Sequence, residues 1–429
     1  MIAPVPDREG HHPSRLQAAG ITTGAAANRH RRRPPRPIAA LRVNAFTSTS
    51  AAGRGNRATL DAIRSRTSGL SRNDFGPQPI DTYIGRVRGI EDEPLPASLK
   101  HWDCRNNRLA WLALNQDEFL NAISAARQRY GRTRVAIVFG TSTACIGATE
   151  QAYRDLDRQT HQFPRHLRDP RIHTPHSTGE FLRDALDLGG ICVTVGTACS
   201  SSAKVFAEAE RLIRCGVADA AVVGGVDTLC GSVLFGFNSL ELVSHEECRP
   251  FDISRDGINL GEAAGFALVG REGAGPRLLG YGESSDAYHM SSPHPDGLGA
   301  RVAIADALAR ADLPVASVDY VNLHGTASRK NDEVEARVIT ETFDPDTLAS
   351  STKGWTGHTL GAAGVLEAVI TLLALDQSLA PGTLNTTQLD PSCSGQIRLE
   401  NTHTRIQTGM SLSFGFGGSN CALLFGQNA

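Results

Sequence analysis

Short apolar runs alternate with longer runs of helical periodicity along most of this chain. Continuous apolar, often β-branched runs predict strands, whereas apolar positions three or four residues apart predict helices. The expected strands cover residues 134–139, 191–195, 219–223, 263–269, 318–323, 408–413 and 420–425. The expected helices cover residues 181–188, 201–215, 301–311, 332–342 and 365–375. This alternation is typical of an α/β fold with buried sheets.

The order of strand, short polar loop and alanine-rich helix occurs twice, at residues 194–212 and 350–373. A duplicated fold follows as a hypothesis, which unrelated topologies in the two halves would contradict. Turn-forming residues at 271–276 separate the halves. We therefore expect an N-terminal half at residues 37–272 and a C-terminal half at residues 273–429.

The first 36 residues differ from the rest of the chain. Residues 1–36 carry Pro, Gly, Ala and Arg, and they show neither apolar periodicity nor the apolar core of a secretory signal. We expect a disordered basic extension there. An Arg-rich transit peptide and a basic arm stay open as alternatives.

Composition narrows the classes of partner. The 429 residues include 43 basic and 45 acidic side chains and give a net charge of −2, so nothing indicates nucleic acid or an acidic membrane surface. The sequence contains no run of roughly 18 apolar residues, so no membrane-spanning helix is expected. The nine scattered cysteines lack metal-site spacing, which favours a reducing, cytoplasmic compartment without a metal site. Most of them, such as Cys192, are expected to be small core residues.

Cys199 is the exception, because of where it stands. It lies where the strand expected at residues 191–195 turns into the helix expected at residues 201–215. The first N–H groups of a helix have no internal partner and carry partial positive charge. A thiolate at that point is stabilised, so we expect a nucleophile whose pKa falls below the free value of about 8.5.

Two later segments supply candidate partners for this thiol. His324 follows the strand expected at residues 318–323, at an edge where side chains project into clefts, and Thr326 and Ser328 can hydrogen-bond a chain-like ligand. Lys353 and His358 stand among glycines before an apolar helix that contains Glu367.

A helix this apolar is buried, so Lys353 and Glu367 are costly there unless they pair or take part in function. The pair can simply hold the loop, or it can orient His358. A third segment, Gly-Phe-Gly-Gly at residues 415–418, can direct a backbone N–H into a site. It lacks the spacing of phosphate-binding loops.

Together these segments resemble the β-ketoacyl-acyl-carrier-protein synthases of types I and II, members of the thiolase-fold superfamily. The similarity covers residues 38–429 and rests on several motifs in the same order. They are Thr-Ala-Cys-Ser-Ser at 197–201, Pro-Phe-Asp-Ile-Ser-Arg-Asp at 250–256, Gly-Tyr-Gly-Glu-Ser-Ser-Asp at 280–286, His-Gly-Thr at 324–326, Gly-Ala-Ala-Gly at 361–364 and Gly-Phe-Gly-Gly at 415–418.

The resemblance implies a duplicated α/β thiolase fold of five layers, αβαβα, with two mixed sheets. It implies that Cys199 receives an acyl chain from acyl carrier protein as a thioester, and that the N–H groups of Cys199 and Phe416 form an oxyanion hole. His324 and His358 would bind the malonyl thioester and promote its loss of CO₂. The resulting carbanion would attack the acyl chain in a Claisen condensation.

The resemblance also assigns supporting positions. Lys353 and Glu367 are expected on the His358 side, and Asp332 with Glu335 match the acidic pair of the family. No cofactor is expected, since the phosphopantetheine arm arrives on the carrier protein. The expected substrate-binding residues are Thr326, Ser328, Gly417 and Gly418.

Some segments bear on the subfamily. Two histidines with a lysine argue against type III synthases, which pair His with Asn, and against thiolases, which use a second Cys. Arg329 and Lys330 depart from the usual pattern and could meet an acidic carrier protein. The segments at 140–143, 228–231 and 286–290 are most similar to synthases of aryl-polyene or xanthomonadin-type pigments.

Two alternative functions accompany this prediction. One is a housekeeping fatty-acid synthase of type I or II. The other is a non-catalytic chain-length partner subunit, against which the presence of Cys199, His324 and His358 argues. We expect a homodimer, or a heterodimer with a chain-length-factor-like paralogue.

Overall fold

One long mixed sheet of eleven strands consists of two five-stranded halves and the short β2 (Gly53–Arg54), which pairs with β1. The first half has the order β1 (Leu41–Ser50), β9 (Ala263–Gly270), β7 (Ala220–Asp227), β5 (Val135–Gly140), β6 (Cys192–Val195). The second has the order β10 (Arg277–Ser285), β16 (Ser419–Gly426), β15 (Thr408–Gly415), β11 (Tyr320–Asn322), β12 (Leu348–Ser350). Only a short β1–β10 pairing, around Leu41 and Leu278, joins the halves.

The two halves share one topology. If the five strands of each half are numbered from 1 to 5 in chain order, their order across the sheet is 1-5-4-2-3 in both halves. In both halves the first two neighbouring pairs along this order are antiparallel and the last two pairs are parallel. The duplicated fold expected from the sequence is confirmed at this level.

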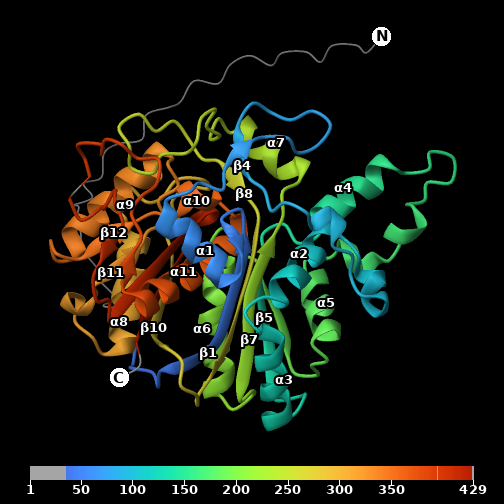
Figure 1. Ribbon diagram of the computed structural model, residues 1–429, viewed down its shortest axis with the longest axis horizontal. Coiled ribbons are helices and arrows are strands. Elements are labelled where there is room, and N and C mark those ends of the chain that lie inside the picture. Colours follow the sequence, from blue (N-terminus) through green and yellow to red (C-terminus); the bar gives the residue numbers. More distant parts are fainter. Residues whose placement is uncertain (1–34, 394, 428–429) are drawn as a thin grey trace, which may run out of the picture. The chain divides into compact units, whose positions relative to one another are not determined.

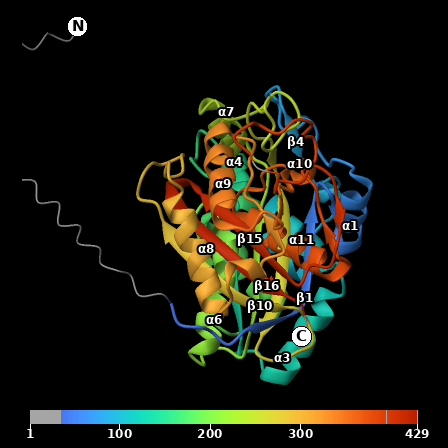
Figure 2. The ribbon, with the colours of Figure 1, turned by 90° about the vertical axis from the view of Figure 1, so that its left-hand side faces the viewer.

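Helices complete five layers. Figure 1 shows α6 (Ser201–Arg214) and α11 (Ala363–Gln377) between the two half-sheets, and both helices share one apolar core with β7 and β16. The outer face of the first half is covered by α2 (Arg105–Leu114), α3 (Phe119–Tyr130) and α5 (Ser177–Ala185). Figure 2, turned by 90° from Figure 1, shows α8 (Leu298–Ala311) and α9 (Arg329–Thr342) over β10, β15 and β16.

The computed structural model describes residues 35–393 and 395–427, so the basic extension predicted at residues 1–36 lies almost entirely outside the described residues. From Pro35 onward the chain is one compact unit. The boundary predicted between residues 272 and 273 falls in the connection from β9 to β10, and the division into two domains stays a prediction.

Shorter elements complete the chain. The remaining helices are α1 (Gly55–Ser65), α4 (Ile146–Arg154), α7 (Gly231–Ser239) and α10 (Lys353–Thr356). The remaining strands are β3 (Ser71–Arg72), β4 (Tyr83–Gly85), β8 (Leu260–Gly261), β13 (Leu379–Ala380) and β14 (Thr402–His403). The short 3₁₀ turns are η1 (Ile90–Asp92), η2 (Ala97–Trp102), η3 (Arg165–Leu167), η4 (Pro170–His173), η5 (Val315–Ser317), η6 (Leu360–Ala362) and η7 (Phe416–Gly418).

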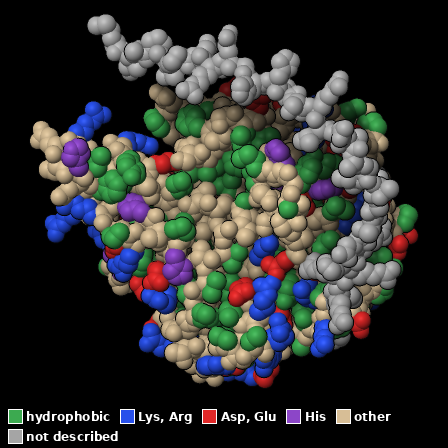
Figure 3. All heavy atoms as spheres, turned by 180° about the vertical axis from the view of Figure 1, so that it is seen from behind, with side chains coloured by type: hydrophobic (Ala, Val, Ile, Leu, Met, Phe, Trp, Pro, Cys, Tyr) green, Lys and Arg blue, Asp and Glu red, His purple; other side chains and the backbone are tan. Residues whose placement is uncertain are grey.

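The segment after α4 projects from the body of the molecule (Figure 1). Residues 155–176 contain four arginines and four histidines, and Figure 3 shows basic side chains on this projection. With three aspartates against the four arginines, this segment has a net charge of +1 when its histidines are neutral, so it is slightly more basic than the chain as a whole.

The most apolar helix lies in the core. Residues 360–377 are long and apolar enough to cross a membrane, but 89% of that stretch is buried inside the protein. The helix α11 packs against α6, β9 and β15, which explains why it has almost no polar face.

Strand β7 is longer than its sequence predicts. The strand was expected to end at residue 223 because two glycines follow, yet it continues to Asp227. A Cβ on Gly225 would lie 2.5 Å from the Cβ of Ser202, so the glycine makes room for α6 rather than forming a turn. The extra residues carry Asp227 to the edge where the candidate site lies.

Candidate active site

Cys199 lies in the turn between β6 and α6, as the sequence predicts. The preceding residue, Ala198, has a left-handed φ of 52°. The Ser201 side chain fixes this turn, because its hydroxyl accepts a hydrogen bond from the Thr197 N–H (2.9 Å) and donates to the Ala198 carbonyl (2.6 Å). The side chain of Cys199 is buried beside the first turn of the helix.

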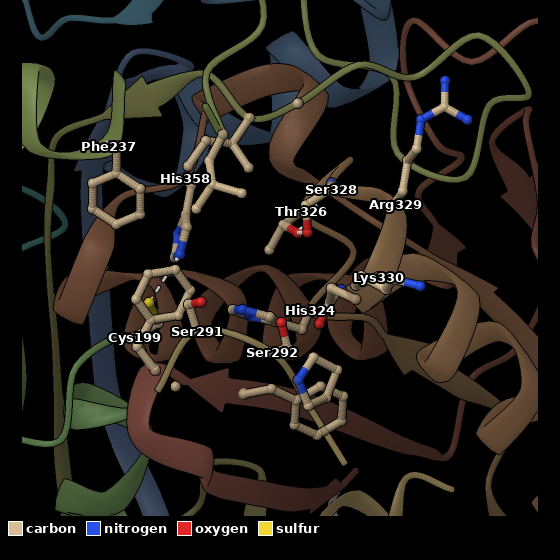
Figure 4. Close-up of a pocket in the computed structure, with 18 of the residues that line it drawn as sticks. Cys199, Phe237, Ser291, Ser292, His324, Thr326, Ser328, Arg329, Lys330 and His358 are labelled. Atoms are coloured by element: carbon tan, nitrogen blue, oxygen red, sulfur yellow. Dashed lines mark hydrogen bonds between the residues drawn. The ribbon is translucent and has the colours of Figure 1, made fainter. Parts of the chain in front are cut away.

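His358 contacts this thiol directly. Its Nε2 lies 3.0 Å from the Cys199 Sγ (Figure 4). His358 stands between β12 and α11 in the second half, the place that Cys199 takes between β6 and α6 in the first. The two helix starts meet where the Val365 N–H donates to the Ser202 hydroxyl (2.9 Å), so the duplication itself brings the two residues together.

His324 completes the group of three. It follows β11, at the edge of the sheet predicted for it, and its ring centre lies 5.3 Å from that of His358 at an interplanar angle of 87°. Figure 4 shows Cys199, His324 and His358 pointing into the same cavity. The ring of Phe414 also lies near His324, with ring centres 5.8 Å apart.

Lys353 and Glu367 form a buried ion pair, but on a different side from the one expected. The Lys353 ammonium donates to Glu367 and to the backbone carbonyl of His324, and lies 3.5 Å from the His324 Nδ1. The expectation that the pair supports His358 is therefore wrong. Gly357, with a φ of 68°, ends α10 and redirects the chain between Lys353 and His358.

Asp332 and Glu335 hold the backbone around His324. The Glu335 carboxylate accepts hydrogen bonds from the N–H groups of His324 and Gly325, both at 2.7 Å. The Asp332 carboxylate accepts from the Phe251 N–H at 2.8 Å and so connects the segment at residues 250–256 to α9. Burial raises the pKa of Glu335 to about 8 and that of Asp332 to about 6. Both carboxylates act on the loop rather than on the cavity.

The expected low pKa of Cys199 is wrong for the resting site. Burial raises the pKa of its thiol to about 11, and the hydrogen bond from the Phe416 N–H and the charge of Lys353 offset this only in part. Burial and then Lys353 also lower the pKa of both His324 and His358 well below the usual value. Desolvation is the largest effect on all three groups, so the site holds a protonated thiol beside two neutral imidazoles.

A cavity of about 360 Å³ opens above these residues. Thr326 and Ser328, whose hydroxyls lie 2.9 Å apart, line one wall together with Arg329 and Lys330. These four residues mark the wall that leads from His324 toward α9.

The Phe416 segment also lines this cavity. Phe416 and Gly418 both line the cavity, whereas Gly417 does not. The Gly417 N–H instead donates to the Met290 carbonyl (2.7 Å). Gly417 and Gly418 have φ values of 79° and 76°, which only glycine adopts easily. The structure therefore brings Gly418 to the cavity, while Gly417 shapes the loop.

Two residues at the site escaped the sequence analysis. Phe237 of α7 stacks on Phe416, with ring centres 5.5 Å apart, and closes the cavity near Cys199. The buried Asp227 accepts hydrogen bonds from Thr141, Ser142 and Thr143. The apolar residues of 233–237 form a nearly continuous run with little helical periodicity, so the sequence contains no clear signal for the first. The apparent turn at residues 224–225 concealed the second.

The described part of the chain contains no evident binding site for a metal ion. Among those residues, no group of three or more His, Cys, Asp or Glu side chains could hold a metal ion. The absence of a metal and a cofactor from the reaction stays a prediction.

Two family models match the chain. The N-terminal domain of β-ketoacyl synthase matches residues 112–274, and the C-terminal domain of the same enzymes matches residues 277–387. The chain belongs to the β-ketoacyl synthase family. The thiolase-type fold expected from the motifs is thereby confirmed.

Known relatives are synthases. The chain is similar to the ketosynthase ApeO, solved in complex with its chain length factor ApeC from Xenorhabdus doucetiae, with 34% identity and a TM-score of 0.82 over 90% of this chain and 98% of that one. It is 40% identical over 252 residues to the mitochondrial 3-oxoacyl-[acyl-carrier-protein] synthase of Arabidopsis thaliana, covering 53% of this chain and 55% of the relative.

A third relative is 3-oxoacyl-[acyl-carrier-protein] synthase 2 of Coxiella burnetii. It is 37% identical over 257 residues, which cover 56% of this chain and 62% of the relative. The chain thus spans between half and two thirds of the length of the curated relatives it matches.

Proposed function

We propose that this protein is a β-ketoacyl-[acyl-carrier-protein] synthase that elongates carrier-bound chains by decarboxylative Claisen condensation. One observation carries the proposal. A buried thiol, Cys199, lies 3.0 Å from the Nε2 of His358, and the ring of His324 faces the same cavity. The family supplies the reaction class, and this geometry supplies a place for each step.

The first step loads the acyl chain on Cys199. The neutral His358 can accept the thiol proton, so a thiolate forms when an acyl thioester arrives although the resting pKa is high. The thiolate attacks the thioester carbonyl, and the carrier's phosphopantetheine thiol leaves with a proton. The N–H groups of Cys199 and Phe416 receive the charge that develops on the carbonyl oxygen.

The second step releases CO₂ from malonyl thioester. Once Cys199 is acylated, His358 takes the tautomer with its proton on Nε2, exchanging the Nδ1 proton with solvent. Both neutral imidazoles then donate from Nε2 to the thioester oxygen and so stabilise the enolate that remains when the carboxylate departs. His324 and His358, whose rings lie nearly perpendicular, can both reach one oxygen placed between them. Lys353 and Glu335 position His324 through its carbonyl and its N–H.

The third step joins the chains. The enolate carbon attacks the acyl carbonyl on Cys199, and the tetrahedral intermediate collapses with the thiolate as leaving group. The product is a β-ketoacyl chain, longer by two carbons, on the carrier that brought the malonyl unit. No cofactor belonging to the protein enters these steps.

The carrier protein is proposed to dock at the wall formed by Thr326, Ser328, Arg329 and Lys330. The two hydroxyls suit the phosphopantetheine arm, and the two cations suit an acidic partner surface. Lys330 lies 4.0 Å from its nearest acidic neighbour, Glu333, and its side chain is 79% exposed, so its charge remains available.

A second subunit is proposed to dock at β6. In the part of the chain that the structure describes, this edge strand pairs with β5 alone, and all four of its residues are half-buried. An unpaired strand edge is a template for another strand. We favour a chain-length-factor-like paralogue as partner, because the relative ApeO was solved with such a factor, and a homodimer stays the alternative.

The proposed product is an aryl-polyene-type chain. This choice rests on the segments at 140–143, 228–231 and 286–290. Housekeeping fatty-acid synthesis is the second candidate, favoured by the names of the curated relatives. A cytoplasmic location accords with nine cysteines that are all unpaired.

A reconstituted assay with malonyl and acyl carrier proteins tests the activity. The wild-type protein is expected to release CO₂ and form β-ketoacyl carrier protein, and Cys199→Ala is expected to form no condensation product. Condensation by Cys199→Ala at the wild-type rate would refute the assignment. A panel of primers separates the pathways, since a preference for saturated long chains over aryl-polyenoyl chains would reject the pigment proposal.

A further inference from the structure

Two cysteines outside the candidate active site lie in direct contact. The Sγ atoms of Cys104 and Cys145 are 3.3 Å apart, and no other cysteine pair among the described residues makes such a contact. Cys104 precedes α2 and Cys145 precedes α4, so each thiol stands at the start of a helix. The 41-residue separation in sequence means that the fold, not a local motif, brings them together.

We propose that Cys104 and Cys145 form a dithiol that closes reversibly to a disulfide when the protein meets a peroxide. The sulfur atoms must approach by only about 1.3 Å to reach disulfide length, which a rotation of side chains and a small shift of one loop can supply. The proposal rests on this geometry alone and does not depend on the proposed function.

An oxidant can reach the pair. Cys104 is half-buried, and both thiols line a cavity of about 430 Å³ that is separate from the cavity above Cys199. Cys145 also lines a second hollow, on the side of β6. A small peroxide can therefore approach the sulfurs without passing the candidate active site.

The surroundings favour a thiolate on Cys145. The hydrogen bond from Cys104 lowers the pKa of Cys145, and the hydroxyls of Ser177 and Thr178, whose oxygens lie 3.5 and 3.7 Å from its sulfur, act in the same direction against the effect of burial. Cys199 differs, since burial raises its pKa to about 11. The same hydrogen bond raises the pKa of Cys104, so Cys145 is the thiol of the pair that ionises first and that should react with peroxide before Cys199 does.

The chemistry balances in two steps. The Cys145 thiolate attacks one peroxide oxygen, the O–O bond breaks, and a sulfenic acid forms with release of hydroxide, which is protonated to water. The Cys104 thiol then attacks the sulfenic sulfur, the S–O bond breaks, and a second water leaves. One peroxide is reduced and two thiols are oxidised, and an external dithiol reverses the change.

The pair adjoins a loop that reaches the candidate active site. Residues 141–144 directly precede Cys145, and the Ser142 hydroxyl accepts a hydrogen bond from the Gly361 N–H (3.0 Å), three residues after His358. A disulfide would tie this loop covalently to α2. The oxidation state of the pair would then affect the position of the backbone that follows His358.

Peptide mapping of the full-length protein tests the proposal without any assay of activity. After limited hydrogen peroxide and rapid alkylation, trypsin should release residues 101–105 linked to residues 135–154, with the loss of two hydrogens. Each of these peptides holds a single cysteine, so the link would be unambiguous. Dithiothreitol should restore both alkylatable thiols, and Cys199 should remain a free thiol at the same dose.

Variants supply the controls. Cys104→Ser and Cys145→Ser should each abolish the linked peptide, whereas Cys215→Ser, which removes an exposed thiol elsewhere, should leave it unchanged. The proposal would be overturned if Cys104 and Cys145 stayed alkylatable at doses that oxidise Cys215. It would equally be overturned if they ended as separate sulfinic acids. Since the wild-type mapping needs no variant, misfolding of a variant cannot obscure the result.

Discussion

Asp227 gives the sharpest test of how the fold holds the candidate site together. This carboxylate is fully buried at the end of β7. It accepts hydrogen bonds from the Thr141 hydroxyl (2.6 Å), from the N–H (3.0 Å) and hydroxyl (3.1 Å) of Ser142, and from the N–H (2.9 Å) and hydroxyl (2.5 Å) of Thr143. Replacement by alanine removes the one acceptor that these donors share.

The expected loss follows from these contacts. A hydrogen bond to a charged group contributes about 1.5–3 kcal/mol, and contributions within one network do not add. Water can replace the carboxylate at Ser142, which is exposed, but not at the buried Thr141. We therefore expect Asp227→Ala to lower the free energy of unfolding by about 2–4 kcal/mol. For a unit of this size, with an unfolding entropy of about 0.8 kcal/mol per kelvin, this corresponds to a fall in Tm of about 3–5 °C.

The control lies at the other end of the same strand. Asp219 directly precedes β7, is 39% exposed in its side chain, and forms an ion pair with Arg134 at 2.8 Å. Surface pairs contribute about 0–1 kcal/mol, so Asp219→Ala should lower Tm by about 1 °C or less. Calorimetry of both variants measures the difference. Equal shifts for the two variants, or a loss under 1 kcal/mol for Asp227→Ala, would refute the reasoning.

Three further predictions concern the site itself. The rate of Cys199 alkylation by iodoacetamide should rise about tenfold per pH unit between pH 7 and 9, because burial holds the pKa of this thiol near 11. A rate that does not change with pH in this range would contradict that pKa. Lys353→Met should lower kcat about 100-fold or more, because the loop that carries His324 is then no longer held in place. Lys330→Met should leave kcat near the wild-type value. Equal kcat values for the two variants in steady-state kinetics would contradict the role of Lys353 in positioning His324. Gly361→Ala would place a Cβ 2.6 Å from a carboxylate oxygen of Asp227 and should lower the free energy of unfolding in urea by about 1–3 kcal/mol. Gly236→Ala, whose Cβ would have no atom within 4 Å, should not lower it. Similar urea midpoints for the two variants would contradict this prediction.

Apolar periodicity predicted the second half of the chain well. The helices expected at residues 301–311, 332–342 and 365–375 correspond to α8, α9 and α11, each of which begins two or three residues earlier in the structure. Long apolar faces define such helices, while their first turns are set by caps that the pattern does not contain. Apolar periodicity does not identify the helices of the first 130 residues, which are α1, α2 and α3.

Contacts between distant segments explain what the sequence left hidden. Cys192 was expected in the core but is half-buried, because β6 is an edge strand and its free side faces outward. The partner of Lys353 is His324 rather than His358, since the choice depends on how β11 and α10 meet in space. The pKa of Cys199 depends on burial by the second half of the chain, which its own strand-to-helix turn does not reveal.

The family and the residues at the centre of the site could be predicted, because each lies in a short motif. Cys199 lies between β6 and α6, His324 follows β11, and His358 lies in the loop between α10 and η6. Their mutual geometry needed the duplicated fold, which sets two helix starts against each other at Ser202 and Val365.

The most direct test of the central claim is to map the acyl chain on the protein. Wild-type protein mixed with octanoyl carrier protein, and without any malonyl thioester, should gain one octanoyl group on Cys199, found by mass spectrometry of the intact protein and of its peptides. Addition of malonyl carrier protein should then remove that group and yield a ten-carbon β-ketoacyl carrier protein. An octanoyl group on another cysteine, or none on Cys199, would contradict the account.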